Sequence, residues 1–379
     1  MRREDGFSLI EIMVALAIGM LGVLVMLQMF ALSEERNRTA SSGGDAQSNG
    51  ILTFDRLQSD IVRAGYGMNS VGLFNCKATW QVASGSYLGN AIRLAPVTIN
   101  PVGATGAAII PVGDPNTDTL LVMYGNADGE PEGNKAETAA SPTYTVQMPS
   151  SFTVGDRVIA VPAACAADLI VDRISAVGTT SVTVAAGATG TSLFNLGRGP
   201  NGLPSASGPN GPTVLAYAIR SGNLTVCDYV KNDCSIAANT GNASVWEQLA
   251  SNVASLRAQY GRDTTATMDG VVDVYDQSTP ATACGWARVS AIRLALVTRS
   301  AQFEKTGGTS TAPIYVTTAA PTWAGSTIDN PTGSSVAAID LTKKPDGTSN
   351  PDWKNYRYKL FQTVMPIRNV AWMGVPTGC

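Results

Sequence analysis

A long apolar stretch near the N-terminus constrains this chain more than any other feature of its sequence. Residues 7–32 are apolar apart from Ser8, Glu11 and Gln28, and a short charged leader, residues 2–5, precedes them. A helix needs about 20 apolar residues to cross a bilayer, so this stretch is long enough to span a membrane. Because the two arginines of the leader precede the span, the positive-inside rule predicts a cytoplasmic N-terminus and an extracytoplasmic body.

Glu11 is the unusual residue of the stretch. A carboxylate costs about 2.5 kcal/mol or more at the centre of a membrane helix, so it usually has a partner and a function. Cleavage of the backbone after Gly6 would create an α-amino group on Phe7 in the same apolar layer. The amino group of one chain could then pair with Glu11 of its neighbour, each charge offsetting the desolvation of the other. Such pairing staggers adjacent subunits, as a filament requires.

The sequence Gly-Phe-Ser-Leu-Ile-Glu (residues 6–11), with the apolar run behind it, resembles the class III leader of type IV pilins and pseudopilins. The resemblance implies that a prepilin peptidase cleaves after Gly6 and methylates the amino group of Phe7. It also implies that Glu11 sets the register between subunits, and that the helix behind it serves membrane insertion and assembly. The assembly residues expected on this helix are Phe7, Leu9, Ile10, Ile12, Gly19 and Gly22.

Two other interpretations of the N-terminus stay open. The run is longer than the 7–15-residue apolar region of a secretory signal, although Ala31-Leu32-Ser33 would pass as a cleavage site. An ordinary signal anchor that carries a glutamate is the other alternative. Gly19 and Gly22 indicate either close helix packing or simply a membrane helix that tolerates glycine.

Composition argues against catalysis. The chain has 379 residues, a formal net charge of −3 and no histidine, which removes histidine-activated nucleophiles and histidine zinc sites. No basic stripe suggests nucleic-acid binding. The acidic segments 128–137 and 269–276 lack the spacing of a calcium loop, and the glycine-rich segment 197–212 lacks a phosphate-loop ending, so solvated loops are expected. We therefore expect a non-enzymatic protein with no cofactor and no metal.

Six cysteines follow the span, at positions 76, 165, 227, 234, 284 and 379. An even number of cysteines in an oxidising compartment indicates disulfides. Cys227 and Cys234 are close enough in sequence to close a small loop, so this pair is favoured. The partners of Cys76, Cys165, Cys284 and Cys379 stay open, and a four-cysteine metal site is the alternative.

The chain is expected to stay helical beyond the membrane. Residues 33–49 are polar, and Gly43-Gly44 indicates a break or flexible joint, because glycine weakens a helix by about 1 kcal/mol relative to alanine. Helical periodicity then returns and predicts an amphipathic segment ending near Gly65, where glycine can stop a helix. Its expected apolar face consists of Ile51, Phe54, Leu57, Ile61 and Val62.

The remainder reads as a β-rich body with long loops. Runs of β-branched and aliphatic residues bounded by turn residues predict strands at 91–97, 119–124, 152–161, 169–177, 181–185, 214–220 and 223–227. A tight hairpin is expected at residues 220–223. A Ser-x-x-Glu capping box at residue 244 predicts a helix over 245–260. Two further strands are expected at 287–300 and 356–370, with a long loop at 306–351 between them.

Two stretches narrow the resemblance to large minor pilins called PilW-like. One is Asp-Ile-Val-Arg-Ala-Gly-Tyr-Gly at residues 60–67, and the other is the Tyr-Arg-Tyr-Lys-Leu-Phe…Pro-Ile-Arg-Asn pattern at 356–369. Residues 75–227 resemble these minor pilins only in their general character and share no specific motif with them. Gln28 lies near the place where many major pilins have proline, so the filament geometry of major pilins does not transfer in detail.

Together these features predict an α+β, pilin-like fold: a long N-terminal helix packed on an antiparallel β body. The expected divisions are a leader (1–6), a membrane or filament-core helix (7–32), a helical continuation (33–66) and the body (67–379). The resemblance implies a minor pilin that primes pilus assembly at the tip, first in the bacterial inner membrane and then on the cell surface. It implies prepilin peptidase, other minor pilins and the major pilin as partners, with a tip adhesin as a further candidate. A type II secretion pseudopilin and a membrane-anchored extracytoplasmic binding protein are the alternatives.

Overall fold

The computed structural model describes residues 8–83, 86–103, 108–127, 129–162, 165, 168–198, 212–308, 311, 313–327, 337–376 and 378–379. The expected cleavage site, Gly6 and Phe7, lies outside the described residues. So does the repeated Gly-Pro-Asn-Gly sequence within the glycine-rich segment 197–212.

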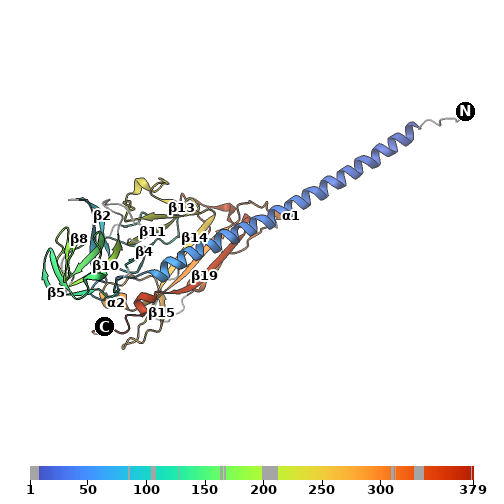
Figure 1. The fold of residues 1–379 in the computed structure, drawn as a ribbon. Coiled ribbons are helices and arrows are strands. Elements are labelled where there is room, and N and C mark those ends of the chain that lie inside the picture. The colour runs from blue at the N-terminus through green and yellow to red at the C-terminus, as the bar shows by residue number, and fades with distance from the viewer. Residues whose placement is uncertain are drawn as a thin grey trace.

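One helix, α1 (Leu9–Arg63), projects from the body as a stalk (Figure 1). Its 55 residues correspond to a length of about 83 Å. The helix continues through Gly43 and Gly44, so the break expected there is wrong. Glycine weakens a helix but keeps its backbone N–H, so the ladder of hydrogen bonds need not be interrupted.

A five-stranded antiparallel sheet forms the middle of the body, with the order β13-β12-β11-β4-β3. Successive side chains of a strand point to opposite faces, and here both faces are buried: Leu120 and Val122 contact the α1 side, whereas Leu121 and Met123 contact the other. A two-residue turn with positive φ at Ser221 joins β11 to β12, which confirms the expected hairpin. The strands are β3 (Val97–Ile99), β4 (Leu120–Tyr124), β11 (Thr213–Arg220), β12 (Asn223–Asp228) and β13 (Glu247–Ala250).

A small closed barrel is inserted between β4 and β11, at the pole of the body opposite the N-terminus (Figure 1). It closes because β8 pairs with β7 on one side and with β9 on the other. Its interior is apolar, and the outer side of β7 and β10 packs on the five-stranded sheet through Ile159 and Phe194. The strands are β5 (Asn134–Ala140), β6 (Thr143–Val146), β7 (Asp156–Val161), β8 (Leu169–Val177), β9 (Ser181–Val184) and β10 (Ser192–Arg198); β1 (Lys77–Ala83) and β2 (Ser86–Arg93) extend this sheet beyond β8.

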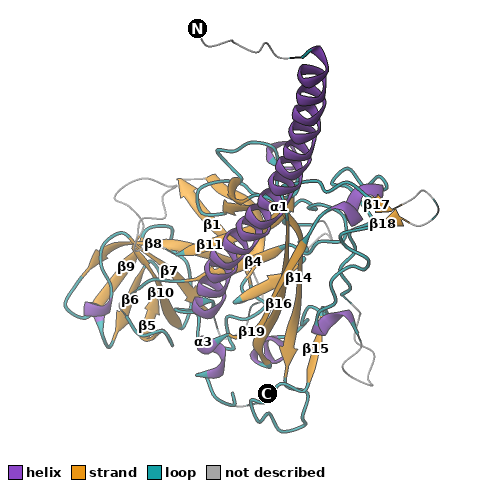
Figure 2. Ribbon diagram, turned by 90° about the vertical axis from the view of Figure 1, so that its right-hand side faces the viewer, coloured by secondary structure: helices purple, strands orange, loops and turns teal. Residues whose placement is uncertain are grey.

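A second antiparallel sheet, with the order β15-β14-β16-β19, carries α1 (Figure 2). Its strands are β14 (Val253–Arg262), β15 (Val274–Asp276), β16 (Val289–Arg299) and β19 (Tyr358–Pro366). Trp323, Ala337 and Ile339 cover the opposite face of this sheet. Part of segment 306–351, which the sequence predicts to be a long loop, therefore packs against the sheet as a layer. The small elements are α2 (Ala283–Ala287), β17 (Gly307–Gly308), β18 (Pro313–Ile314), α3 (Arg368–Ala371) and the 3-10 helices Pro149–Ser151, Ala237–Asn239, Ala324–Ser326 and Pro351–Asn355.

Two expectations for the C-terminal half are wrong in detail. The predicted helix over 245–260 is the strand pair β13 and β14, because Leu256, Ala258 and Tyr260 alternate into the core while β14 pairs with β16. That alternation of two outweighs the helical spacing that the capping box suggested. The last expected strand ends at Pro366, and the short helix α3 follows it. The fold class, a long N-terminal helix followed by a mainly antiparallel β body, is confirmed.

Candidate assembly helix and its junction with the body

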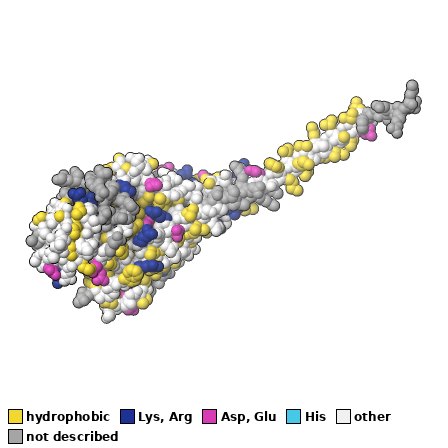
Figure 3. Space-filling view, in the orientation of Figure 1, with side chains coloured by type: hydrophobic (Ala, Val, Ile, Leu, Met, Phe, Trp, Pro, Cys, Tyr) yellow, Lys and Arg dark blue, Asp and Glu magenta, His cyan; other side chains and the backbone are white. Residues whose placement is uncertain are grey.

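The first half of α1 is an uncovered apolar rod. Leu9–Phe30 is 22 residues long, is apolar enough to cross a membrane, and has none of its surface buried by the rest of the chain. Apolar side chains cover the side of the rod that is seen in Figure 3. The expected assembly residues Leu9, Ile10 and Ile12 are exposed on it, and Gly19 and Gly22 have open space where a side chain would lie.

Glu11 lies in the first turn of this rod. Its carboxylate accepts a hydrogen bond of 3.1 Å from the backbone N–H of Ser8. The side chain is exposed, so it is accessible to a second molecule. A carboxylate at a helix N-terminus is favoured by the helix dipole, which explains why Glu11 suits the first turn even without a partner.

The second half of α1 packs on the body through one regular stripe. Four of its members are Ala46, Gly50, Leu57 and Ile61. Their spacings of four and seven residues correspond to about one and two helical turns, which places them on one side of the helix. The expected apolar face is therefore correct for Leu57 and Ile61 but wrong for Ile51, which is 51% exposed. Phe54 and Val62 are only partly buried.

Small residues in this stripe let the helix approach the sheet closely. A methyl group at Gly50 would overlap the ring of Phe361 on β19. The rings of Phe54 and Phe361 pack at a centroid distance of 6.2 Å. The hydroxyl of Thr298 on β16 donates to the carbonyl of Ala46 at 3.0 Å. Side chains of the sheet thus contact the helix backbone directly, at the end of the body nearest the stalk.

Asp60 is the polar centre of the junction. Its side chain is 2% exposed and accepts hydrogen bonds from Tyr217 at 2.5 Å, from Tyr124 at 2.8 Å and from Arg56 Nε at 3.0 Å. Burial, followed by the charge of Asp60, raises the pKa of Tyr217 well above its usual 10.0, so this hydroxyl stays a donor. One carboxylate therefore connects α1 to β4 and β11 together.

The C-terminus of α1 is closed by the last part of the chain. The side-chain amide of Asn369 donates to the carbonyls of Arg63 and Ala64, both at 3.0 Å, which satisfies groups that a helix end leaves unpaired. Gly65 follows with φ +82°, a conformation that suits glycine, and its N–H donates to Met123 at 2.8 Å. The two stretches that carried the PilW-like resemblance, 60–67 and 356–369, therefore meet at this junction.

Sequence reasoning missed several residues of the junction. It did not single out Gly50, Asp60, Tyr217 or Asn369 for their contacts. Asp60 could have been found, because it occupies a stripe position three residues after Leu57, where a polar residue needs a buried partner.

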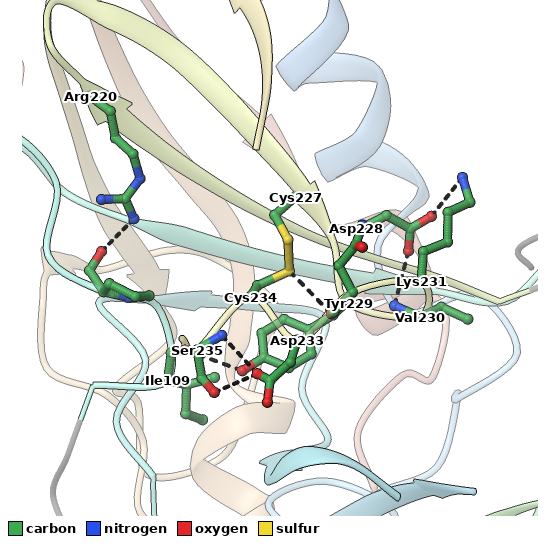
Figure 4. Close-up of a disulfide and its surroundings, with 12 residues drawn as sticks. Ile109, Arg220, Cys227, Asp228, Tyr229, Val230, Lys231, Asp233, Cys234 and Ser235 are labelled. Carbon is green, nitrogen blue, oxygen red and sulfur yellow. Dashed lines mark hydrogen bonds and ion pairs between the residues drawn. A yellow bond between two sulfur atoms is a disulfide. The ribbon is translucent and has the colours of Figure 1, made fainter. Parts of the chain in front are cut away.

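Three disulfides fasten the body. Cys227 pairs with Cys234, the pair that the sequence favours; Cys76 pairs with Cys165, and Cys284 with the C-terminal Cys379. Two further contacts hold the small loop closed by the Cys227–Cys234 bridge. Within the loop, Lys231 forms an ion pair with Asp228 at 3.1 Å, and the hydroxyl of Tyr229 donates to the carbonyl of Ile109 at 3.2 Å (Figure 4). With every cysteine paired, the alternative four-cysteine metal site has no thiolate.

Two protein-family models match parts of this chain. Residues 217–369 match the family described as Type IV Pilus-assembly protein W (PilW). Residues 1–27 match the prokaryotic N-terminal methylation motif.

The chain carries a PilW-family domain and a prepilin methylation motif.

The PilW match begins at Tyr217, which binds Asp60, and ends at Asn369, which caps α1. Comparison with curated proteins gives no match. Among solved structures, a type IV-like pilin from Thermus thermophilus is similar at 10% identity, with 86% of this chain and 97% of that chain covered and a TM-score of 0.33. A TM-score this low carries no argument about function. Within the described part of the chain, no group of His, Cys, Asp or Glu side chains is arranged to hold a metal ion.

Proposed function

We propose that this chain is a minor pilin that primes type IV pilus assembly and occupies the pilus tip. Prepilin peptidase would cleave after Gly6 and methylate Phe7. The protein would wait in the inner membrane with its N-terminus cytoplasmic and its body, residues 67–379, periplasmic. It would then join other minor pilins and the major pilin through the N-terminal helices, and a tip adhesin is a further candidate partner.

The observation that supports this function is the contrast between the two halves of α1. The second half is committed to the body through Asp60 and the buried stripe, whereas Leu9–Phe30 has no cover at all. Bare apolar surface of this extent requires either lipid or other helices around it. A helix that is embedded first in a bilayer and then among subunits meets that requirement in both states.

The size of the body favours the tip. A body of more than 300 residues would crowd a filament if it were repeated in every subunit, but it fits a cap. Type II secretion pseudopilins use the same leader, and the PilW match over residues 217–369 favours the pilus.

Processing and Glu11 give the test. The protein is isolated from its native host as wild type, Glu11→Ala and the control Glu34→Ala, which removes a carboxylate of the same helix outside the span. Intact mass and N-terminal sequencing should show a chain that starts at N-methylated Phe7 in all three. Surface pili should be lost with Glu11→Ala and kept with Glu34→Ala. A native protein that keeps Met1, or that starts beyond residue 32, would refute the proposal.

A further inference from the structure

A small cavity lies where the two antiparallel sheets of the body meet. The β11–β12 turn, the start of β14, the end of β16, the start of β19 and segment 340–350 form its wall. Its volume is about 90 Å³, which is several times the roughly 10–15 Å³ that one water molecule needs. Sites for drug-sized ligands are larger, at about 300–1,000 Å³. The cavity therefore suits one compact chemical group.

Three cationic side chains line this cavity, those of Arg299, Lys343 and Lys344. Among the residues that the structure describes, none of the three forms an ion pair, and none donates a hydrogen bond from its side chain. Like charges that gather without a carboxylate partner repel one another, and an anion placed between them relieves that repulsion. The three positive charges are therefore available to an anionic ligand.

Arg299 is held in place by aromatic rings. Its guanidinium carbon lies 4.6 Å from the centroid of the Tyr356 ring, and that ring packs edge-on against Phe303 at a centroid distance of 5.8 Å. Stacking uses the face of the guanidinium, whereas its five N–H donors lie in its plane. A stacked arginine is therefore a positioned cation that can still donate hydrogen bonds to an oxyanion.

The two lysines are carried by a short turn with its own backbone hydrogen bonds. Lys343 pairs with Ser349 across the turn, and the backbone N–H of Lys344 donates to the carbonyl of Thr348 at 2.9 Å. Both lysine side chains are exposed. The turn thus fixes the two backbones beside the cavity, while the long side chains can adjust to a ligand.

Two carboxylates also line the cavity, and other donors occupy both. Asp114 accepts hydrogen bonds from two backbone N–H groups of the β11–β12 turn, at 2.8 and 2.7 Å. Asp340 accepts from the N–H and the hydroxyl of Thr342, at 2.8 and 2.6 Å, and from the side-chain amide of Asn116 at 2.9 Å. The pKa of Asp340 is lowered mainly by the Thr342 hydroxyl, and the charge of Lys343 contributes less. All four carboxylate oxygens therefore have partners other than the three cations.

We propose that this cavity binds a phosphate group, free or carried by a larger molecule, through Arg299, Lys343 and Lys344. A phosphate group carries a charge of about −1.5 to −2 at pH 7 and has strong acceptor oxygens on several sides. It can therefore accept from the guanidinium on β16 and from the two ammonium groups of the turn at the same time. Arginine binds phosphate through its planar fork and lysine through a point charge. This site goes beyond the proposed function and does not depend on it.

Binding of inorganic phosphate to the full chain in non-ionic detergent is the first test. Isothermal titration calorimetry at constant ionic strength, with sodium chloride as the matched salt, should show saturable binding at one site. Arg299→Gln and the double change Lys343→Gln/Lys344→Gln should each weaken binding by about tenfold or more, because each removes charge-assisted hydrogen bonds. The control Lys305→Gln/Lys359→Gln removes two exposed lysines that do not line the cavity, and it should bind phosphate as the wild type does.

The lysine double variant separates binding from folding. Because Lys343 and Lys344 are exposed, this variant should keep the wild-type melting temperature without phosphate, whereas Arg299→Gln also loses its stacking on Tyr356. Glucose 1-phosphate is the second ligand. Binding of both ligands assigns the site to a phosphate group on a larger molecule, and binding of inorganic phosphate alone assigns it to the free ion. If the wild type binds neither ligand, or if the control variant is weakened as much as the Lys343/Lys344 variant, the inference is wrong.

Discussion

Replacing Asp60 tests whether one carboxylate holds α1 to the body. Asp60→Leu removes the acceptor of two tyrosine hydroxyls, that of the buried Tyr217 and that of the partly buried Tyr124. An unsatisfied buried hydroxyl costs about 1–3 kcal/mol, and the partly buried Tyr124 should cost less than Tyr217, so the two together should cost about 2–5 kcal/mol. The ion pair with Arg56 adds little, because that guanidinium is 61% exposed. Typical domains have only about 5–15 kcal/mol of stability, so the loss should be large.

The assay is chemical unfolding of the full chain in detergent, followed by tryptophan fluorescence with the disulfides intact. Arg56→Gln is the control and should cost less than about 1 kcal/mol, because it removes only the exposed partner. Tyr217→Phe should cost clearly less in the Asp60→Leu background than in the wild type, since the hydroxyl it removes has already lost its acceptor. Asp60→Leu within about 0.5 kcal/mol of wild type would refute the account of the junction.

Three further predictions concern other parts of the chain. Gly50→Ala should destabilise the protein by about 1–3 kcal/mol, because the added methyl group would overlap Phe361, whereas Gly44→Ala has open space and should stabilise the isolated chain by up to about 1 kcal/mol. Thermal unfolding of both variants measures the difference, and equal effects would contradict the packing described for Gly50. Burial alone would raise the pKa of Asp263, but hydrogen bonds, the largest from Thr265, outweigh burial and lower the pKa from 3.8 to about 2. The ionised carboxylate should therefore contribute its full stability above about pH 4 and lose it as the pH falls through about 2. Unfolding curves of Asp263→Asn, measured over the same pH range, should lack this dependence. The Cys284–Cys379 bridge closes a sequence separation of 95 residues and the Cys227–Cys234 bridge one of 7. Serine substitution of the first pair should therefore lower the free energy of unfolding by about 2 kcal/mol more than substitution of the second pair. Denaturant midpoints that rank the two pairs the other way would contradict this order.

The sequence predicted the long helix and eight of the strands, β4, β7, β8, β9, β11, β12, β16 and β19, because their signals are local. An apolar run of membrane length, and runs of β-branched residues between turn residues, determine local structure with little help from distant contacts. The face of the helix was harder to predict. Ile51 and Leu57 are equally apolar, and which of them is buried depends on Phe361, which approaches Gly50 from far along the chain.

Closure of the barrel had no local signal, and the local signal of the strand pair at 247–262 was ambiguous. The barrel closes because β8 pairs with β7 along one edge and with β9 along part of the other, and pairing partners cannot be read from composition. Residues 245–260 fit both a helical spacing and an alternation of two; pairing of β14 with β16 decides between them. The role of Asp60 in the junction was not predicted for a related reason, because its two tyrosine partners lie 64 and 157 positions away along the chain.

The cap that Asn369 places on α1 has a consequence for the order in which the protein is made. Its amide reaches back over 305 and 306 positions to the carbonyls of Ala64 and Arg63, so the first element of the chain is completed by nearly the last. While a ribosome is still synthesising the body, the C-terminal end of the helix has neither its cap nor its sheet. Contacts between such distant positions form late, because the long loop between them must close first. A chain that stops short of Asn369 would keep this helix end open, so a finished junction marks a subunit that has been translated at least as far as Asn369.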